Sequence, residues 1–307
     1  MAYHGQQLAA SPSDGFSYPL VHMEPWIDGD YTKVKTLAKA IHGKVYLYRH
    51  NASGMMLVMK KMPNETVLRY KDTLLEDPQN EIGISFFLSY MTPSHLSSYC
   101  VRMLGVFQCP SYTYFATEFC TGGELFEVVS QKQRLDETTS RQYVAQVLLA
   151  VEGMHAQGLV HRDISLENTL LHADGTCRIL DFAQSSYYLE LDKNTGQVKE
   201  RLLNARAGKD YYRSPEMWFS GYRGPPCDIF ACGVLMFIML FGTPPWRAAV
   251  YEDDLFQYIS KHSVRKLLVS WRRHNSVSPD AIDLLEKLLK KKIDQQNLRV
   301  RRGISKS

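Results

Sequence analysis

The sequence predicts an α+β fold in which a small β-rich part is followed by a larger α-helical part. Strand-like alternation of apolar and polar residues runs through residues 31–62 and returns over residues 101–119. Beyond residue 120, apolar residues recur at helical spacing over residues 137–155, 228–241 and 279–292. The two patterns meet at Thr121-Gly122-Gly123, and no repeat period runs through the chain, which excludes a solenoid.

The boundaries of the folded domain follow from composition. Residues 1–18 are rich in Gly, Gln, Ser and Pro, so residues 1–25 are expected to form a disordered tail without a signal segment. The domain is expected to span residues 26–300, with its β-rich part ending near residue 119 and a helix within that part over residues 77–90. Residues 301–307 form a basic tail, and Arg299 to Arg302 are either a localisation patch or a solvated terminus.

Charge and hydropathy argue against nucleic-acid and membrane partners. The 307 residues include 36 basic and 32 acidic side chains, and a formal charge of +4 is too small to indicate nucleic-acid binding. The longest apolar stretch, Ala231 to Phe241, is about half a membrane span and predicts a buried helix. The six cysteines form no C-x-x-C pair, so we expect reduced thiols and a cytoplasmic or nuclear protein.

Three motifs occur in a fixed order in the second part of the chain. Residues 158–168 read Gly-Leu-Val-His-Arg-Asp-Ile-Ser-Leu-Glu-Asn, Asp181-Phe182-Ala183 begins thirteen residues after Asn168, and Ser214-Pro215-Glu216 follows. In this order they resemble the H-R-D-x-x-x-x-N, D-F-G and A-P-E motifs of the protein kinase family. The resemblance extends from about Tyr31 to Arg299 and leaves no room for a second domain. It implies a two-lobed protein-kinase fold, with a small β-rich N-lobe and a larger α-helical C-lobe.

Two further segments match this family. Residues 228–233 resemble its D-x-W-S-x-G helix start, whose aspartate supports the catalytic loop from behind, and residues 242–246 resemble G-x-P-P-F. Phosphoryl transfer requires positioning and charge neutralisation more than covalent help. The resemblance therefore implies that Asp163 accepts the proton of the incoming hydroxyl, and that Asn168 and Asp181 bind Mg²⁺, a hard cation that prefers oxygen ligands. Asp and Asn also cap loops, but three of them at kinase spacing favour the functional interpretation.

The N-terminal part supplies the nucleotide side of the resemblance. Residues 57–60, Leu-Val-Met-Lys, resemble the V-A-I-K strand, and Lys60 lies fifteen residues after Val45, close to the family spacing. The match implies that Lys60 binds the α- and β-phosphates of ATP and pairs with an acidic residue of the next helix. Glu81 is preferred to Glu76 because apolar residues surround it, and Lys61 is expected to be solvated on the opposite strand face.

The same resemblance assigns the rest of the ATP site. Thr117 is expected to guard the back of the adenine pocket, the backbone from Glu118 to Cys120 to bind the adenine edge, and Glu124 to reach the ribose or a basic substrate residue. The expected ATP-binding residues are Ala38, Gly43, Val45, Lys60, Glu81, Thr117, Glu118, Cys120, Glu124, Asn168 and Asp181.

Three departures from the family pattern weaken the match. The glycine loop G-x-G-x-x-G appears as residues 38–43, Ala-Lys-Ala-Ile-His-Gly, which predicts a weaker grip on ATP because alanine restricts the backbone. Ala183 replaces the glycine of D-F-G, although Asp181 is present. Ser85 stands where relatives place an apolar residue that links the lobes.

A fourth departure concerns a positive charge. Serine/threonine kinases usually carry a lysine two residues after the catalytic aspartate, and Ser165 stands there instead. In the facing G-T-x-x-Y-x-A-P-E segment, Lys209 takes the place of the threonine. We interpret the pair as a relocated charge, which makes Lys209 a predicted catalytic residue.

The substrate class follows from the same loops. Tyrosine kinases resemble H-R-D-x-A-A-R-N with a tryptophan before the final P-E, whereas residues 165–167 and Tyr212 fit the serine/threonine type better. Glu124 and Glu167 favour basic residues upstream of the target in a protein substrate, unless they are simply solvated charges.

The segment from Asp181 to Glu216 is longer than a usual activation segment. Residues 187–191 and 197–202 flank Asp192 to Gly196 and predict an extra hairpin. Arg162 is expected to pair with a phosphate on this segment. The candidate acceptors are Ser185, Ser186, Tyr187 and Thr195.

The sequence thus predicts a protein kinase that uses ATP and Mg²⁺ to phosphorylate serine or threonine. A pseudokinase that binds partners is the main alternative, and a small-molecule kinase of related fold is a remote third. An active enzyme is favoured because the chain keeps residues that a pure scaffold does not need: Lys60, Glu81, Asp163, Asn168 and Asp181. The sequence indicates neither the particular substrate nor an oligomeric state.

Overall fold

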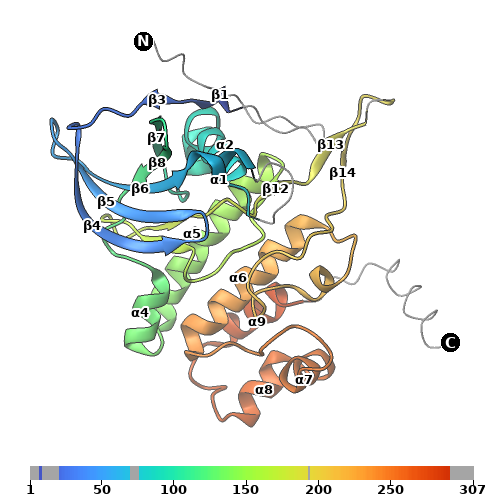
Figure 1. Ribbon diagram of the computed structural model, residues 1–307. Helices are drawn as coiled ribbons and strands as arrows, with labels where there is room; N and C mark the ends of the chain where they lie inside the picture. The colour runs from blue at the N-terminus through green and yellow to red at the C-terminus, as the bar shows by residue number, and fades with distance from the viewer. Residues whose placement is uncertain (1–6, 9–20, 70–75, 193, 291–307) are drawn as a thin grey trace.

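The computed structural model describes residues 7–8, 21–69, 76–192 and 194–290, which form two lobes (Figure 1). The N-lobe is a six-stranded sheet with the strand order β3-β7-β8-β6-β5-β4, antiparallel except for the pair β3 and β7. Its strands are β3 (Glu24–Pro25), β4 (Tyr31–Ala40), β5 (Gly43–His50), β6 (Met56–Pro63), β7 (Met103–Gln108) and β8 (Tyr112–Glu118). Its helices are α1 (Asn64–Arg69) and α2 (Pro78–Phe86), with a π-helical continuation over Phe87–Met91 and a short α3 (Ser94–Ser97).

Helix α2 begins where its sequence signals a start. The carboxylate of Asp77 accepts a hydrogen bond from the Gln79 backbone amide (2.8 Å). Pro78 lies in the first turn, where a backbone N–H has no partner within the helix, so its missing N–H costs no hydrogen bond. Together with its π-helical continuation, α2 confirms the helix expected over residues 77–90. Ile82 is buried against the sheet, which directs the preceding residue, Glu81, towards the lobe interface.

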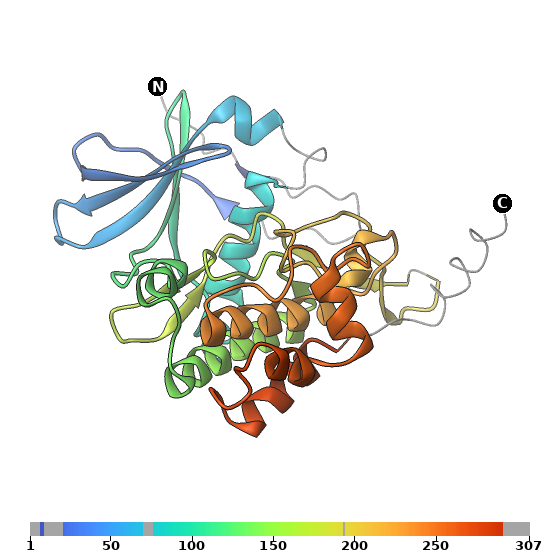
Figure 2. The same ribbon diagram turned by 90° about the horizontal axis from the view of Figure 1, so that it is seen from below.

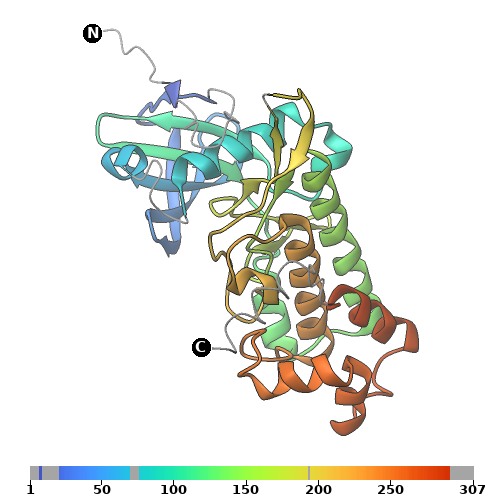
Figure 3. The same ribbon diagram turned by 90° about the vertical axis from the view of Figure 1, so that its right-hand side faces the viewer.

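The C-lobe is mainly helical (Figure 2). Its helices are α4 (Leu125–Lys132), α5 (Glu137–Ala156), α6 (Gly224–Phe241), α7 (Asp254–Lys261), α8 (Val264–Ser270) and α9 (Pro279–Leu288). Short strands β9 (Leu159–Val160), β10 (Thr169–Leu171), β11 (Cys177–Ile179) and β12 (Ser186–Tyr187) lie between α5 and α6 in sequence, followed by a 3-10 turn over Pro215–Trp218. Figure 3 shows the sheet and the helical lobe at opposite ends of the molecule, with α5 and α6 lengthwise in the C-lobe.

Helix α6 forms the centre of the C-lobe core. It is 18 residues long with a mean hydropathy of 1.8, sufficient by length and composition to cross a membrane, but 83% of this window is buried within the protein. Such burial is typical of a core helix, as predicted for residues 231–241.

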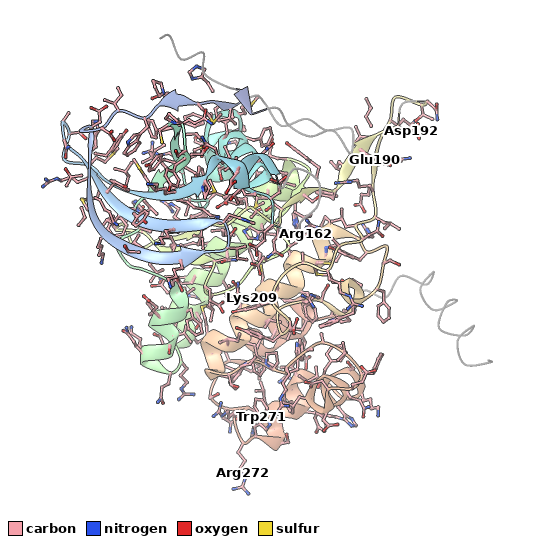
Figure 4. The ribbon with its side chains drawn as sticks, viewed as in Figure 1. Arg162, Glu190, Asp192, Lys209, Trp271 and Arg272 are labelled. Carbon is pink, nitrogen blue, oxygen red and sulfur yellow. The ribbon has the colours of Figure 1, made fainter. Side chains whose placement is uncertain are left out.

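The extra hairpin in the activation segment is confirmed. Strands β13 (Leu189–Leu191) and β14 (Val198–Glu200) pair antiparallel, with Leu191 opposite Val198. The Asp192 carboxylate accepts backbone hydrogen bonds from Asn194 (2.9 Å) and Thr195 (3.2 Å), which shapes the turn. The hairpin projects from the body of the molecule, with Glu190 and Asp192 towards its end (Figure 4).

The N-terminal boundary lies earlier than the predicted end of the tail at residue 25. Strand β1 (Gln7–Leu8) pairs with β2 (Val21–His22), and Val21 and Met23 are buried in the N-lobe core. The expected tail was based on the polar composition of residues 1–18, and its end at residue 25 wrongly included the buried Val21 and Met23. The remainder of the expected tail and the basic tail over residues 301–307 lie outside the described residues, as do Arg299 to Arg302.

Candidate active site

A cavity of about 510 Å³ lies between the sheet of the N-lobe and the loops of the C-lobe. Most residues predicted for ATP binding or catalysis line this cavity: Ala38, Val45, Lys60, Glu81, Thr117, Glu118, Glu124, Asp163, Asn168, Asp181 and Lys209. Gly43 and Cys120 are not among its lining residues. The volume is typical of a small-molecule site.

Lys60 and Glu81 form the ion pair expected from the sequence. The Lys60 Nζ lies 2.6 Å from Glu81 Oε2, and both side chains are nearly buried. Burial alone would lower the pKa of Lys60, but the carboxylates of Glu81 and Asp181 outweigh it and raise the pKa above its ordinary value. Lys60 therefore stays charged at neutral pH and faces the cavity.

Lys61 occupies the opposite face of β6, as predicted. Its Nζ lies 3.8 Å from the centre of the Tyr112 ring and 5.3 Å from that of Tyr114, on the outer face of the sheet. The register pairs Lys60 with Val45 on one neighbouring strand and Phe115 on the other, which fixes its inward direction.

The catalytic loop is built around Asp163. Its carboxylate accepts a hydrogen bond from Asn168 Nδ2 (2.7 Å), and its carbonyl accepts another from the same amide (2.9 Å). Burial raises the pKa of Asp163, while Lys209 and His161 oppose the rise. The preceding residue, Arg162, has a φ of +69°, a strained conformation for a long side chain that is common at functional sites.

Asp228 holds this loop from the α6 side, as the sequence implied. The carboxylate accepts backbone hydrogen bonds from His161 (2.9 Å) and Arg162 (2.8 Å), and a third from the His155 ring (2.8 Å). Burial by itself raises the pKa of Asp228, but these donors outweigh it and lower the pKa below its usual range.

Lys209 reaches the catalytic aspartate from the facing loop. Its Nζ lies 3.4 Å from Asp163 Oδ2 and 2.9 Å from the Ser165 hydroxyl oxygen. Figure 4 shows Lys209 near the junction of the lobes, where the curved strands meet the helical part. The geometry meets the expectation that this ammonium occupies the space beside Ser165, and its role in catalysis remains a prediction.

A family profile described as the protein kinase domain matches residues 31–298. The chain belongs to the protein kinase family. CBL-interacting serine/threonine-protein kinase 24 of Arabidopsis thaliana is 32% identical over 228 residues, which are 74% of this chain and 46% of that protein. CBL-interacting protein kinase 21 of Oryza sativa subsp. japonica is 31% identical over 266 residues, 85% of this chain and 46% of that protein. Calcium-dependent protein kinase 4 of Solanum tuberosum is 29% identical over 282 residues, which are 91% of this chain and 47% of that protein. The chain spans about half the length of the curated relatives it matches.

The candidate metal ligands of this kinase domain fit Mg²⁺ delivered with a nucleotide. Asn168 uses its amide nitrogen on Asp163, which leaves its amide oxygen as the ligand atom, and Asp181 lines the same cavity. Within the described residues, no group of three or more His, Cys, Asp or Glu is arranged to hold a metal alone. Mg²⁺ usually takes one or two carboxylates and completes its octahedron with phosphates and water, so this donor set fits the ion.

The glycine loop of this kinase is a tight hairpin between β4 and β5. Ala40 pairs with Gly43, so only Ile41 and His42 form the turn. Gly43 has a φ of +153°, and a Cβ there would lie 2.1 Å from the Lys61 carbonyl oxygen, which explains why glycine stands at this position. Gly43 therefore acts on the strand pairing of the loop, and Ala38 lies nearer to the cavity than Gly43 does.

The segment expected to bind adenine connects the lobes. Thr117 and Glu118 line the cavity, whereas the Cys120 side chain is buried away from it. Burial raises the pKa of the Cys120 thiol to about 12, so the thiol is unreactive. We therefore expect Cys120 to contact a nucleotide through its backbone and not through its thiol.

The remaining departures are accommodated without strain. Ala183 has no left-handed backbone conformation and is buried. Ser85 is 2% exposed and lines the cavity. The rings of His161 and Phe182 pack edge to face, with their centres 5.5 Å apart.

The sequence did not identify Glu76, Gln184 and Gly208 as site residues, yet all three line the cavity. A polar Gln directly after Asp181-Phe182-Ala183 was the available signal for Gln184.

Proposed function

We propose that this chain is an ATP- and Mg²⁺-dependent protein serine/threonine kinase. The observation that carries the proposal is the formed Lys60–Glu81 ion pair (2.6 Å), which faces the same cavity as Asp163, Asn168 and Asp181. A scaffold that binds no nucleotide has no requirement for this arrangement. The similarity to CBL-interacting serine/threonine-protein kinases supports the same class.

The chain's own residues supply positioning and charge. Asp163, held in place by Asn168, accepts the proton of the substrate hydroxyl as its oxygen forms a bond to the γ-phosphorus and the bond to the bridging oxygen breaks. Lys60 orients the phosphates, and Lys209 lies where negative charge develops beside Asp163. Mg²⁺, when held by Asn168 and Asp181, neutralises phosphate charge.

We further propose that the substrate is a protein with basic residues near the target. Burial raises the pKa of Glu124, and the neighbouring carboxylates of Glu127 and Glu167 raise it further. Glu167 accepts one hydrogen bond from the Tyr211 hydroxyl (3.2 Å), while its other oxygen is buried and has no hydrogen-bond partner in the described part of the chain. Both Glu124 and Glu167 line the cavity, so their negative charge would attract a substrate guanidinium or ammonium.

The decisive measurement is phosphate transfer from ATP to a generic basic protein, with Asp163→Asn as the control. We expect incorporation into serine or threonine, and at least a hundredfold loss in the control. Nucleotide binding without transfer above the control would favour the pseudokinase, and phosphotyrosine alone would overturn the substrate class. A peptide pair with arginine or alanine before the target serine tests the basic preference, which Glu167→Gln should weaken.

The compartment remains a proposal as well. All six cysteines are free, and five of them are buried. Reduced thiols of this kind support a cytoplasmic or nuclear location, which a fluorescent fusion of the chain would test.

A further inference from the structure

Gln184, the residue after Asp181-Phe182-Ala183, links three separate parts of the active site. Its Nε2 donates a hydrogen bond to Glu76 Oε1 (3.2 Å), and its Oε1 accepts one from the Gly208 amide (2.8 Å). Its backbone carbonyl accepts a third from Arg162 Nε (2.6 Å). The half-buried Gln184 side chain therefore joins the N-lobe to the far end of the activation segment, while its backbone carbonyl contacts the catalytic loop.

The Gly208 bond fastens the backbone directly before Lys209. Gly208 has a φ of +77°, and a Cβ at this position would lie 2.6 Å from the Arg162 carbonyl oxygen. The backbone before Lys209 is thus pressed against the catalytic loop, and Gln184 supplies the acceptor that holds it there. This bond acts together with the Arg213 guanidinium, which donates to the carbonyls of Ala207 (2.9 Å) and Gly208 (2.7 Å) in the segment before Lys209.

The Glu76 bond controls the helix that carries Glu81. Glu76 precedes α2, and its carbonyl is hydrogen-bonded to the ring of His42 (3.0 Å) at the turn of the β4–β5 hairpin. In the first turn of the helix, the Asn80 amide donates to the carbonyls of Phe182, Ala183 and Ser185, at 2.8 to 3.3 Å. The start of α2 is consequently joined to the activation segment by two side chains, Gln184 and Asn80.

One of these bonds engages part of Arg162, the side chain that was expected to receive a phosphate. Arg162 Nε donates to the Gln184 backbone carbonyl (2.6 Å), and the nearby Arg162 charge opposes the rise that burial causes in the pKa of Tyr222. Ser185, a candidate acceptor, is 3% exposed and donates to the His161 carbonyl (3.4 Å). Tyr187 is largely buried, and burial raises its pKa to about 12. Thr195 is exposed in the turn of the projecting hairpin, and Figure 4 shows Asp192 of this hairpin well away from Arg162.

We propose that Gln184 is a positioning residue that holds Lys209 and α2 in their catalytic arrangement without phosphorylation of the activation segment. The inference rests on the proposed kinase function. It assigns the role of a phosphate to one neutral side chain, whose two ends satisfy a carboxylate and a backbone N–H. The arrangement implies activity in the freshly translated chain.

The first test exchanges donor and acceptor. Gln184→Glu keeps an oxygen for Gly208 but opposes two carboxylates across the Glu76 contact, so we expect the transfer rate to fall at least tenfold. Glu76→Gln combined with Gln184→Glu restores an amide-to-carboxylate bond and should recover the rate to within threefold of the wild type. Gln197→Glu adds the same charge to an exposed position of the hairpin and serves as the matched control, with an expected change below twofold.

The second test concerns phosphate itself. Wild-type protein treated with a phosphatase, and shown by intact mass to carry no phosphate, should retain its rate within twofold. Loss of activity after this treatment overturns the inference, as does a Gln184→Glu variant that transfers at the wild-type rate. A double variant no better than Gln184→Glu alone also overturns it.

A third readout separates this inference from the proposed function. In Gln184→Leu, hydrogen–deuterium exchange should become faster at the Gly208 amide and over residues 76–81. A wild-type chain that transfers no phosphate ends the proposed function, whereas unchanged exchange in Gln184→Leu ends the inference whatever the wild type does.

Discussion

Replacing Lys209 with threonine removes the cation that lies beside the catalytic aspartate and restores the residue usual at this position in the family. The Nζ lies 3.4 Å from Asp163 Oδ2. At an effective dielectric constant of about 20, a unit-charge pair at this distance interacts by about 5 kcal/mol. Because 34% of the Lys209 side chain is exposed, solvent screening reduces the usable part to about 3 kcal/mol. The barrier rises because the charge that develops on the transferring phosphoryl group loses this nearby cation, and losing one such donor slows transfer about a hundredfold or more.

The assay is steady-state transfer to a basic peptide, with kcat and KM for ATP measured separately. Lys209→Thr should lower kcat and change KM little, because the ammonium contacts Asp163 and the Ser165 hydroxyl on the transfer side of the cavity. Adding Ser165→Lys returns one positive charge to the same space and should recover at least tenfold of the loss. Unfolding temperatures of all variants show whether burying a lysine at the fully buried Ser165 position disrupts the fold.

Two results would contradict the role of Lys209 as a cation that lowers the barrier. A change below threefold for Lys209→Thr, less than about 1 kcal/mol, means that the ammonium has no role in the barrier. An equal loss in the single and double variants, with both folded, means that charge is not what Lys209 supplies.

Four more outcomes follow from the geometry of the site and its surroundings. Lys60→Met should abolish transfer while Lys61→Met retains it, since only Lys60 faces the cavity; the reverse pattern would place the strand register one residue out. ATP with Mg²⁺ should raise the unfolding temperature more than ATP with a chelator, because two protein oxygens alone bind Mg²⁺ weakly, and equal shifts would favour the pseudokinase. Asp228→Asn should cost about 3 kcal/mol of unfolding free energy near pH 7, because it weakens three buried hydrogen bonds. The pKa of Asp228 is lowered in the folded state, so its contribution should persist above its unfolded pKa of about 3.9 and fade as the pH falls below it, which denaturant titrations at several pH values would show. Gly43→Ala should raise KM for ATP severalfold, since its Cβ meets the Lys61 carbonyl oxygen at 2.1 Å, and an unchanged KM would contradict this account of the hairpin.

Much of the fold was predictable because periodicity and short motifs report local structure. The alternation over residues 31–62 becomes β4 to β6, and the helical spacing over residues 137–155 becomes α5. The choice of Glu81 over Glu76 was also correct, since apolar neighbours such as Ile82 fix which face of α2 is buried.

Features that depend on contacts between distant segments were not predictable in the same way. Val21 and Met23 join the N-lobe core although the segment before them is polar, because a short strand pair brings them onto α2 and the sheet. The hydrogen bonds of Gln184 join residues 108 and 24 positions apart in sequence. No local pattern carries that information, so an unusual residue after a known motif was the only available signal.

The structure also explains which departures from the family pattern the chain tolerates. Ala38, Ala40 and Ala183 replace glycines at positions where none of them has a left-handed backbone conformation. Gly43 and Gly208 are retained where a Cβ would lie 2.1 and 2.6 Å from a neighbouring carbonyl oxygen. Glycine has therefore been lost where the backbone does not require it and kept where the catalytic arrangement depends on it. Gly208 allows the segment before Lys209 to lie against the catalytic loop, which is the arrangement that the proposed kinase activity requires.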